Sequence, residues 1–591
     1  MLTFQNVHRV TLGQAHRTRI IMNNLPFGPL APYQPRQFVP AAIDWNDWPQ
    51  IAPLFDELDR RALATLADRH HWLLDWSELS AALDEEAARR YIAMTCHTDD
   101  ADAEKAYLQF VEVIEPQLKT RQFTLSQRYV AHPLSAPEYA VFNRDVAVTV
   151  ELYRPENVPL ETEEAKLGQQ YQKLAGSLTV QFLGDEKTLT QMSRYLEEPD
   201  RARRQAAWEL VAQRRLQECA TFDAQFDQLR QLRLQIAHNA GFADYLAYIF
   251  RARRRFDYTV ADCQRFHDAV ATEVVPLLRQ LHADRRQQLN LPALRPWDLA
   301  VDPLSRPPLR PFENVAQLSR GAQEIFNRVH PELGANYRLM CDQHLLDLDN
   351  RKGKAPGGYQ STLNEARVPF IFMNAVGVQR DVETLLHEGG HAFHALANQP
   401  EELFAYRNNV PLEFAEVASM SMELLGGEHL EVFYNPADAQ RARRTHLEQI
   451  VTILAWIATV DAFQHWLYTH PIHTTAERST AWLQLMQRFG GDVDWTGYEA
   501  ACANLWHRQL HIFLHPLYYI EYGIAQLGAL QVWANTQEDK PAALAAYRQA
   551  LALGGSRPLP ELFTTAGCRF DFSAATLRPL VAMLHRTLEC V

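Results

Sequence analysis

The length, composition and charge of the chain indicate a globular protein with a large core. Of its 591 residues, 47% are hydrophobic, which is enough to bury such a core. The formal net charge of −13 argues against a nucleic-acid partner, because binding to phosphate groups requires a clustered basic surface.

Cysteine usage and the N-terminal sequence predict a cytoplasmic location. The seven cysteines are odd in number, lie far apart and form no C-x-x-C pair, so we interpret them as free thiols in a reducing compartment. Gln5, His8 and Arg9 interrupt the apolar run that a secretory signal needs. The most apolar stretch, residues 450–460, has about half of the roughly 20 residues that cross a bilayer. We therefore expect a buried core helix there and no membrane partner.

The first part of the chain divides into an irregular arm, residues 1–40, and a helical region, residues 41–185. Five prolines between positions 26 and 40 prevent a continuous helix in the arm. From residue 45 to about 119, apolar residues recur at helical spacing, which predicts an antiparallel helical layer. Two runs rich in β-branched residues, 146–153 and 177–182, predict a small hairpin.

We interpret the remaining residues, 186–591, as the catalytic region. Helical periodicity continues from about residue 189 to 289, and the six prolines within residues 291–311 predict a linker or a wrapped loop. An apolar, strand-like run then occupies residues 368–373, shortly before the residues that carry the chemistry.

The pattern H-E-x-x-H occurs at His387, Glu388 and His391. On a helix, residues four positions apart lie on the same face, so both imidazoles can reach one zinc ion while the intervening glutamate lies beside its water. Asp381 can cap the start of this helix. The segment therefore predicts a zinc site with a general base.

The glycine pair at positions 389 and 390 indicates a close contact at this helix. Each glycine costs about 1 kcal/mol in a helix interior, which is unusual in a helix that is only structural. Close approach of another backbone or of a ligand would explain the pair. The alternative interpretation is that His387 and His391 are core histidines that hydrogen-bond to neighbouring groups.

A catalytic zinc ion usually has three protein ligands, so a third must come from elsewhere. A helix expected over residues 411–425 carries Glu413, Glu416 and Glu423 on one side, because spacings of three and seven return to the same face. We choose Glu416 as the third ligand and Glu423 as the carboxylate that orients a ligand imidazole, with Glu413 as the rival ligand. The alternative is an ordinary solvated acidic face, but this helix is apolar nearly all round, and buried carboxylates need partners.

Together with the metal motif, several other segments resemble the oligoendopeptidase F and thimet oligopeptidase family of zinc peptidases, most of all its bacterial oligoendopeptidase and Pz-peptidase branch. The resemblance covers about residues 180–580. The matching segments are 255–258 (RFDY), 353–359 (GKAPGGY), 368–374 (VPFIFMN), 414–419 (FAEVAS) and 518–522 (YYIEY).

The resemblance implies a mainly α, two-lobed helical fold that encloses a deep substrate channel, with a small β-sheet near the active site. It implies one Zn²⁺ per chain, held by His387, His391 and Glu416, with Glu388 as the catalytic base. It also implies that residues 368–374 form an edge strand to which a substrate peptide is added as a further strand.

Further residues follow from the resemblance as contacts to the substrate. The family takes a donor for the oxyanion from the region of His511, Tyr518, Tyr519 and Tyr522. The thimet branch has another tyrosine three positions after the one that matches Tyr522, whereas this chain has alanine there. The expected substrate-binding residues are Gly357, Gly358 and Tyr359, in a flexible loop over the channel, and Phe370 and Phe372, in the strand.

These features predict a zinc-dependent endopeptidase that hydrolyses internal bonds of short, unfolded peptides, with zinc-activated water and a glutamate base. A zinc carboxypeptidase or dipeptidyl carboxypeptidase on the same fold is one alternative, and it would need a cationic pocket for the substrate C-terminus. A non-catalytic peptide-binding protein is another, but such a protein has no use for Glu388. The sequence leaves the oligomeric state open.

Overall fold

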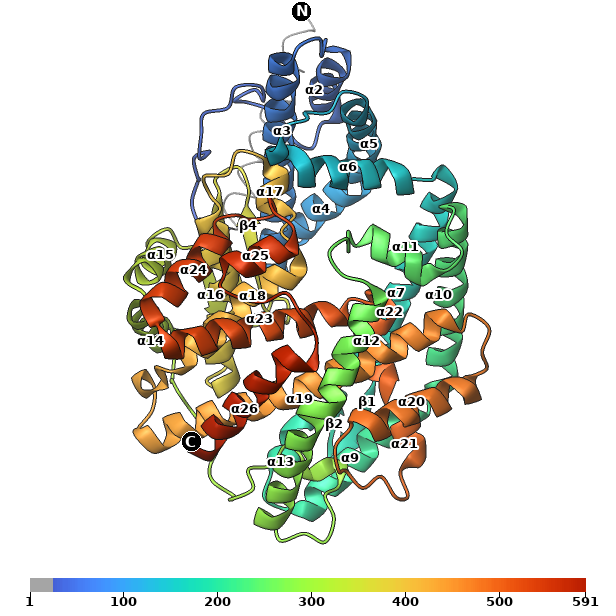
Figure 1. Cartoon of the computed structure of the whole chain (residues 1–591), viewed down its shortest axis with the longest axis vertical. Helices are drawn as coiled ribbons and strands as arrows, with labels where there is room; N and C mark the ends of the chain where they lie inside the picture. The colour runs from blue at the N-terminus through green and yellow to red at the C-terminus, as the bar shows by residue number, and fades with distance from the viewer. Residues whose placement is uncertain (1–24, 591) are drawn as a thin grey trace, which may run out of the picture. The chain divides into compact units, whose positions relative to one another are not determined.

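The computed structural model describes residues 25–590, which are mainly helical, as predicted (Figure 1). Residues 1–24, which include most of the predicted irregular arm, lie outside the described residues. Residues 25–40 contain no helix or strand, in agreement with their prolines.

The chain forms two compact units, each assembled from three stretches of sequence. Unit 1 consists of Met1–Val150, Leu309–Arg443 and Gly528–Phe570, and unit 2 of Glu151–Pro308, Arg444–Leu527 and Asp571–Val591. The predicted linker at residues 291–311 contains no α-helix or strand and includes the point where the chain passes from unit 2 to unit 1. The division at residues 40 and 185 stays a prediction.

Helices supply most of both units. Those of unit 1 are α2 (Trp48–Arg60), α3 (Leu66–Cys96), α4 (Ala101–Gln109), α5 (Glu115–Ala131), α14 (Val315–Val329), α15 (Pro331–Asp342), α16 (Gln379–Ala397), α17 (Phe404–Asn408), α18 (Leu412–Gly427), α24 (Lys540–Leu551) and α25 (Leu559–Thr565). Those of unit 2 are α7 (Val158–Ser177), α8 (Leu189–Met192), α9 (Arg201–Leu216), α10 (Cys219–Asn239), α11 (Tyr245–Ala252), α12 (Val260–Ala269), α13 (Val275–Gln288), α20 (Thr475–Phe489), α21 (Glu499–Ala503), α22 (Leu510–Leu514) and α26 (Ala574–Cys590). The helices α6 (Ala140–Leu152), α19 (Pro436–Thr469) and α23 (Tyr519–Glu538) contain residues of both units.

The predicted helical layer of the N-terminal region is present as α2 to α5, and aromatic side chains form its core. Trp72 and Trp76, one turn apart on α3, have ring centroids 5.3 Å apart. Tyr129 of α5 and Phe142 of α6 meet edge to face at 4.9 Å. Such ring pairs contribute beyond the area that they bury, so this cluster holds the layer together.

The expected hairpin is only partly correct. The run at residues 146–153 lies mostly in helix α6, where Phe142 and Val146 pack one turn apart against the aromatic core. Burial of this face outweighs the preference of β-branched residues for strands. The run at 177–182 does contain a strand, β1 (Thr179–Phe182), but it pairs with β2 (Asp185–Thr188).

A three-stranded sheet in unit 1 has the order β3-β5-β4, with β3 at Leu346–Asp349, β4 at Tyr359–Leu363 and β5 at Val368–Ala375. Strand β5 is parallel to β3 and antiparallel to β4. It is therefore the central strand, and the expectation that residues 368–374 form an edge strand is wrong. The nearly continuous apolar run of β5 fits this position, because a strand covered on both faces has no polar side.

Helices α16 and α18, which lie side by side in unit 1, carry the predicted metal motif (Figure 1). The carboxylate of Asp381, in the first turn of α16, accepts hydrogen bonds from the N–H groups of Val376, Gly377 and Val378 at 2.8 to 3.0 Å. A Cβ atom at Gly390 would lie 2.5 Å from the Cα of Ser419 on α18. Gly390 thus permits the close backbone approach that the glycine pair indicated.

Among the described residues, one helix, α19, is long and apolar enough to cross a membrane by length and composition. Its most apolar window has a mean hydropathy of 1.4, and 72% of that window is buried inside the protein. Val451, Leu454 and Ile457 of this helix are buried, which confirms the core helix predicted at residues 450–460.

The contact between α16 and α18 gives a prediction about stability. Substitution Gly390→Ala places a Cβ against the backbone of α18, which cannot move without shifting the whole helix. We expect the free energy of unfolding to fall by about 1–3 kcal/mol, seen as a lower melting temperature by circular dichroism.

Gly427→Ala is the matched control, because a Cβ there, at the end of α18, meets no atom of the described structure within 4 Å. This control should leave the melting temperature unchanged or raise it slightly. Equal melting temperatures for the two variants would contradict the close packing at Gly390.

Candidate metal and catalytic site

Two neighbouring helices bring together the predicted zinc ligands. On α16, His387 and His391 lie one turn apart, and their Nε2 atoms are 3.5 and 3.7 Å from Oε2 of Glu416 on α18. One ligand atom from each residue lies within 4.8 Å of the other two. Two imidazoles and one carboxylate are a typical ligand set of catalytic zinc, so these residues fit that ion.

The two imidazoles differ in their protonation. Burial lowers the pKa of His391 to about 4, so this side chain is neutral, as a metal ligand must be. Burial also acts to lower the pKa of His387, but the hydrogen bond that its Nδ1–H donates to Glu423 and the charges of nearby carboxylates raise the pKa to about 9. In the metal-free protein His387 therefore carries a proton, which an incoming ion must displace.

Glu423 and Glu413 differ in how they relate to the ligands. A carboxylate oxygen of Glu423 lies 2.7 Å from Nδ1 of His387, so the proton of that nitrogen points to Glu423 and Nε2 faces the metal position. Glu413 is buried on α18, but the convergent group found among the described residues contains Glu416 and not Glu413.

Glu388 has the properties of a general base. Its side chain is buried, and desolvation raises the pKa of the carboxyl group to about 7. The backbone of Gln360 in strand β4 lies close enough to this carboxylate to act against burial and lower its pKa. A base with a pKa near 7 both accepts and returns a proton readily at neutral pH.

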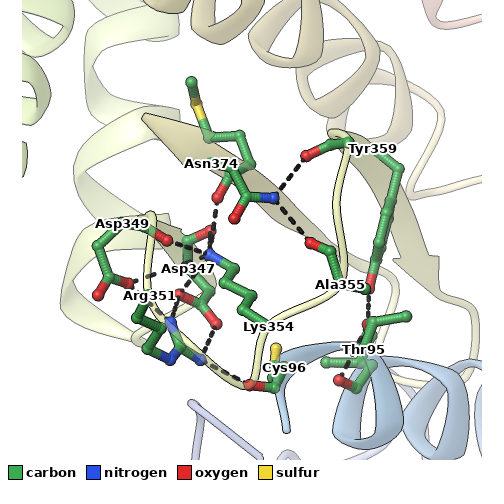
Figure 2. Close-up of polar contacts among 12 residues, drawn as sticks. Thr95, Cys96, Asp347, Asp349, Arg351, Lys354, Ala355, Tyr359 and Asn374 are labelled. Carbon is green, nitrogen blue, oxygen red and sulfur yellow. Dashed lines mark hydrogen bonds and ion pairs between the residues drawn. The ribbon is translucent and has the colours of Figure 1, made fainter. Parts of the chain in front are cut away.

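A dense polar network anchors the loop before β4 (Figure 2). Nζ of Lys354 donates to the carboxylate of Asp347 at 2.9 Å and to the carbonyl groups of Asp349 and Met373 at 2.7 Å. From strand β5, the side-chain amide of Asn374 donates to the carbonyl group of Ala355 at 2.8 Å. The loop predicted to be flexible is therefore bound to the sheet.

Sequence reasoning missed this anchoring role of Lys354. The lysine lies within the segment GKAPGGY that carries part of the family resemblance, and its side chain is fully buried. A buried ammonium group must be paired, which Asp347 and the carbonyl groups provide. The alternating run LDLD at β3, with one aspartate exposed and one buried, was the only sequence signal for a buried partner.

The aromatic residues predicted to touch substrate lie differently from the expectation. The side chains of Phe370 and Phe372 in β5 are 0% exposed, so they form the core of the sheet and cannot contact a peptide. Tyr359 stacks on Phe372 with ring centroids 4.8 Å apart, and its hydroxyl group is 2.6 Å from Oγ1 of Thr95. Gly357 precedes it with φ +102°, a conformation that favours glycine. Gly358, between Gly357 and Tyr359, lies close to the carbonyl group of Phe372.

The four residues predicted to serve the oxyanion form a cluster in unit 2, whereas the metal ligands belong to unit 1. The ring of His511 lies 5.5 Å from that of Tyr518 and 4.9 Å from that of Tyr519, and Tyr522 lies 5.1 Å from Tyr518. Burial lowers the pKa of His511 to about 4, so the ring is neutral. The amide of Gln509 is 2.8 Å from Nδ1 of His511, which leaves the proton on Nε2 available for donation.

The comparison with family models decides the classification. The model described as Peptidase family M3 matches residues 194–581, which is more than half of the chain. The chain belongs to peptidase family M3. This confirms the resemblance to the oligoendopeptidase F and thimet oligopeptidase group.

Known relatives support the same classification of this M3 chain. It is 24% identical over 306 residues to an oligoendopeptidase F homologue of Borreliella burgdorferi, and the match covers 50% of each protein. The chain thus spans about half the length of the curated relative.

Solved structures match almost the whole M3 chain. The X-ray structure of a protein assigned as an oligoendopeptidase F has a TM-score of 0.84 and 29% identity, and covers 94% of this chain and 99% of that one. Pz peptidase A with an inhibitor has the same TM-score and coverage at 27% identity. The mainly α fold with a small sheet is confirmed.

The contact between Glu423 and His387 predicts an effect on metal affinity. Substitution Glu423→Ala removes the acceptor that fixes the orientation of the His387 ring. We expect zinc affinity to fall about 10–100-fold, measured by competition with a chelator of known affinity.

Glu431→Ala is the control, because this exposed carboxylate faces His429 at 3.8 Å instead of a predicted ligand. Glu423→Gln should recover part of the affinity, since an amide oxygen can still accept the Nδ1 proton. Zinc affinity equal to the wild type in Glu423→Ala would show that the contact does not orient the ligand.

Proposed function

We propose that the protein is a zinc-dependent endopeptidase that cleaves internal bonds of short, unfolded peptides. The observation that carries the proposal is the convergence of His387, His391 and Glu416, with Glu388 buried beside them on the same helix. The matched relative is described as an oligoendopeptidase F homologue, which supports the same activity. One zinc ion per chain is part of the proposal.

His387, His391 and Glu416 would hold the ion, which when bound acts as a Lewis acid toward the scissile carbonyl group and water. The carboxylate of Glu388 takes the proton of the attacking water and then delivers it to the leaving amine. Its pKa of about 7 suits both steps. Glu423 keeps the His387 ring in the tautomer that ligates through Nε2.

Strand β4 takes over the role that the sequence assigned to residues 368–374. It is an edge strand of the sheet, and the backbone of its Gln360 contacts Glu388. A peptide paired along this edge would pass the catalytic base and be recognised by its main chain. Gly357, Gly358 and Tyr359 immediately precede or begin the edge and remain proposed substrate contacts.

His511, Tyr518, Tyr519 and Tyr522 are proposed as donors that stabilise the oxyanion. The proposal is supported by the family resemblance and by the neutral ring of His511, which can donate a hydrogen bond. The cytoplasmic location stays a prediction from the seven free cysteines.

Mutations distinguish the roles of the two buried carboxylates, those of Glu388 and Glu416. Glu388→Gln should retain about one zinc per chain and lose turnover by about 10²–10⁴-fold, because it removes the base and no ligand. Glu416→Ala should lose the metal itself, as measured by elemental analysis after desalting. Glu413→Ala is the matched control on α18; loss of metal in this variant, with metal kept in Glu416→Ala, would assign the third ligand to Glu413.

Blocked peptides test the proposed endopeptidase activity against a carboxypeptidase. We expect a peptide of about 5–20 residues to be cut at the same internal bonds whether its termini are free or are acetylated and amidated. A native folded protein should resist, since opening it to supply a strand costs about 5–15 kcal/mol. Mass spectrometry identifies the products. Cleavage that requires a free C-terminal carboxylate would indicate a carboxypeptidase, and binding without cleavage a peptide-binding protein.

A further inference from the structure

A second cluster of ligand-type side chains lies in unit 2, which does not contain the predicted zinc ligands. Cys263 and His267 are four residues apart on α12, and Asp461 and His465 are four residues apart on α19. This spacing puts each pair on one face of its helix. All four side chains belong to buried residues, with exposed fractions of 0% for Cys263 and Asp461, 4% for His267 and 6% for His465.

The side chains of the two helices meet at the carboxylate of Asp461. Sγ of Cys263, a carboxylate oxygen of Asp461 and a ring nitrogen of His465 all lie within 4.8 Å of one another. Nε2 of His267 lies 2.8 Å from Oδ2 of Asp461, and Nε2 of His465 lies 3.3 Å from the same oxygen. His267 therefore fixes the carboxylate while leaving its other oxygen free to bind.

Hydrogen bonding within the protein does not account for this cluster. Oδ1 of Asp461 and Nδ1 of His465 are buried and have no hydrogen-bond partner among the described residues, and Nε2 of His465 faces only the Asp461 carboxylate, at 3.3 Å. Leaving such atoms unpaired in the interior is unfavourable. A purely structural His-Asp-His network would use these atoms, whereas a cation would be bound by them.

Charge and donor chemistry indicate which ion fits. A metal ion bound at this cluster would replace the proton of the Cys263 thiol. The nearby cation Arg255 is paired with Glu521 at 2.7 Å. A thiolate, an imidazole and a carboxylate together suit zinc and similar transition ions better than calcium or magnesium.

We propose that Cys263, Asp461 and His465 bind a second divalent transition ion of the zinc type, with His267 orienting the Asp461 carboxylate. The site is buried and joins two helices that are distant in sequence, so its role is to cross-link α12 and α19 rather than to bind substrate. It is independent of the peptidase site, which contains no sulfur ligand.

Cobalt distinguishes the two sites, because only a thiolate ligand gives an intense near-ultraviolet charge-transfer band with Co²⁺. The full chain is stripped of metal with a chelator, reloaded with Co²⁺ and desalted. We expect about two ions per chain and a charge-transfer band. His391→Ala should lose the peptidase ion and keep the band, and Cys263→Ser should lose the band and keep the peptidase ion.

Two further variants make the test specific. Cys502→Ser removes a different buried thiol of unit 2 and should keep the band. Asp461→Asn preserves the shape of the side chain but removes a ligand charge, so it should weaken binding of the second ion at least 10-fold. Metal should also raise the melting temperature of His391→Ala, whose remaining site is the proposed one.

The wild-type protein alone can overturn the proposal. Absence of the band in folded, Co²⁺-loaded wild type would do so even if every variant of the cluster failed to fold. An unchanged ion count in folded Cys263→Ser would also overturn it. Loss of the peptidase ion alone would instead count against the proposed function and leave this second site intact.

Discussion

The close packing of α16 against α18 is the constraint on which the metal site depends. A Cβ at Gly390 would lie 2.5 Å from the Cα of Ser419, and one at Gly426 would lie 2.7 Å from the Leu386 side chain. Glycines on both helices therefore let their axes approach. At this separation the short carboxylate of Glu416 comes close to two imidazoles one turn apart. Any larger residue at position 390 would move α16 away from α18 and so push the predicted ligands apart.

The same packing explains how ionisable groups are kept in a buried site. Placing carboxylates and imidazoles together in the interior is costly unless their charges compensate. Here His387 is protonated beside Glu423, while His391 stays neutral and Glu388 titrates near neutral pH. A metal ion would exchange the proton of His387 for a stronger positive charge. The site is thus arranged for a cation, although in the metal-free protein the proton on His387 compensates the negative charge of the carboxylates.

The sheet packs against helix α16, which carries this centre. Lys354, buried among Asp347, Asp349 and the carbonyl group of Met373, ties the loop before β4 to the central strand β5 (Figure 2). This anchoring fixes β4, whose Gln360 backbone lies close to Glu388. A rigid edge beside the base positions a peptide backbone without needing particular side chains. Under the proposed function, broad tolerance of substrate sequence would follow.

The sequence by itself determined what depends on local spacing. His387 and His391 share a helix face by the helical period, with Glu388 beside them, and the same rule places Glu413, Glu416 and Glu423 on one side of the next helix. The glycine pair at positions 389 and 390 predicted a close contact at this helix. The helical class, the core helix around residue 455 and the strand at 368–375 were equally readable, because each depends on apolar periodicity along a continuous segment.

Only the tertiary structure decided what depends on long-range pairing. Strand order made β5 central and β4 the edge, since neighbours in a sheet are set by segments that meet only in the fold. The tertiary structure also buries Phe370 and Phe372 and surrounds Lys354 with partners. Residues 146–152 are helical because they pack against an aromatic core that is distant in sequence. Cys263 and Asp461 are on separate helices, and no local pattern links them. Their meeting is a product of packing, because side chains far apart in sequence become ligands of one site only when the core brings their helices together.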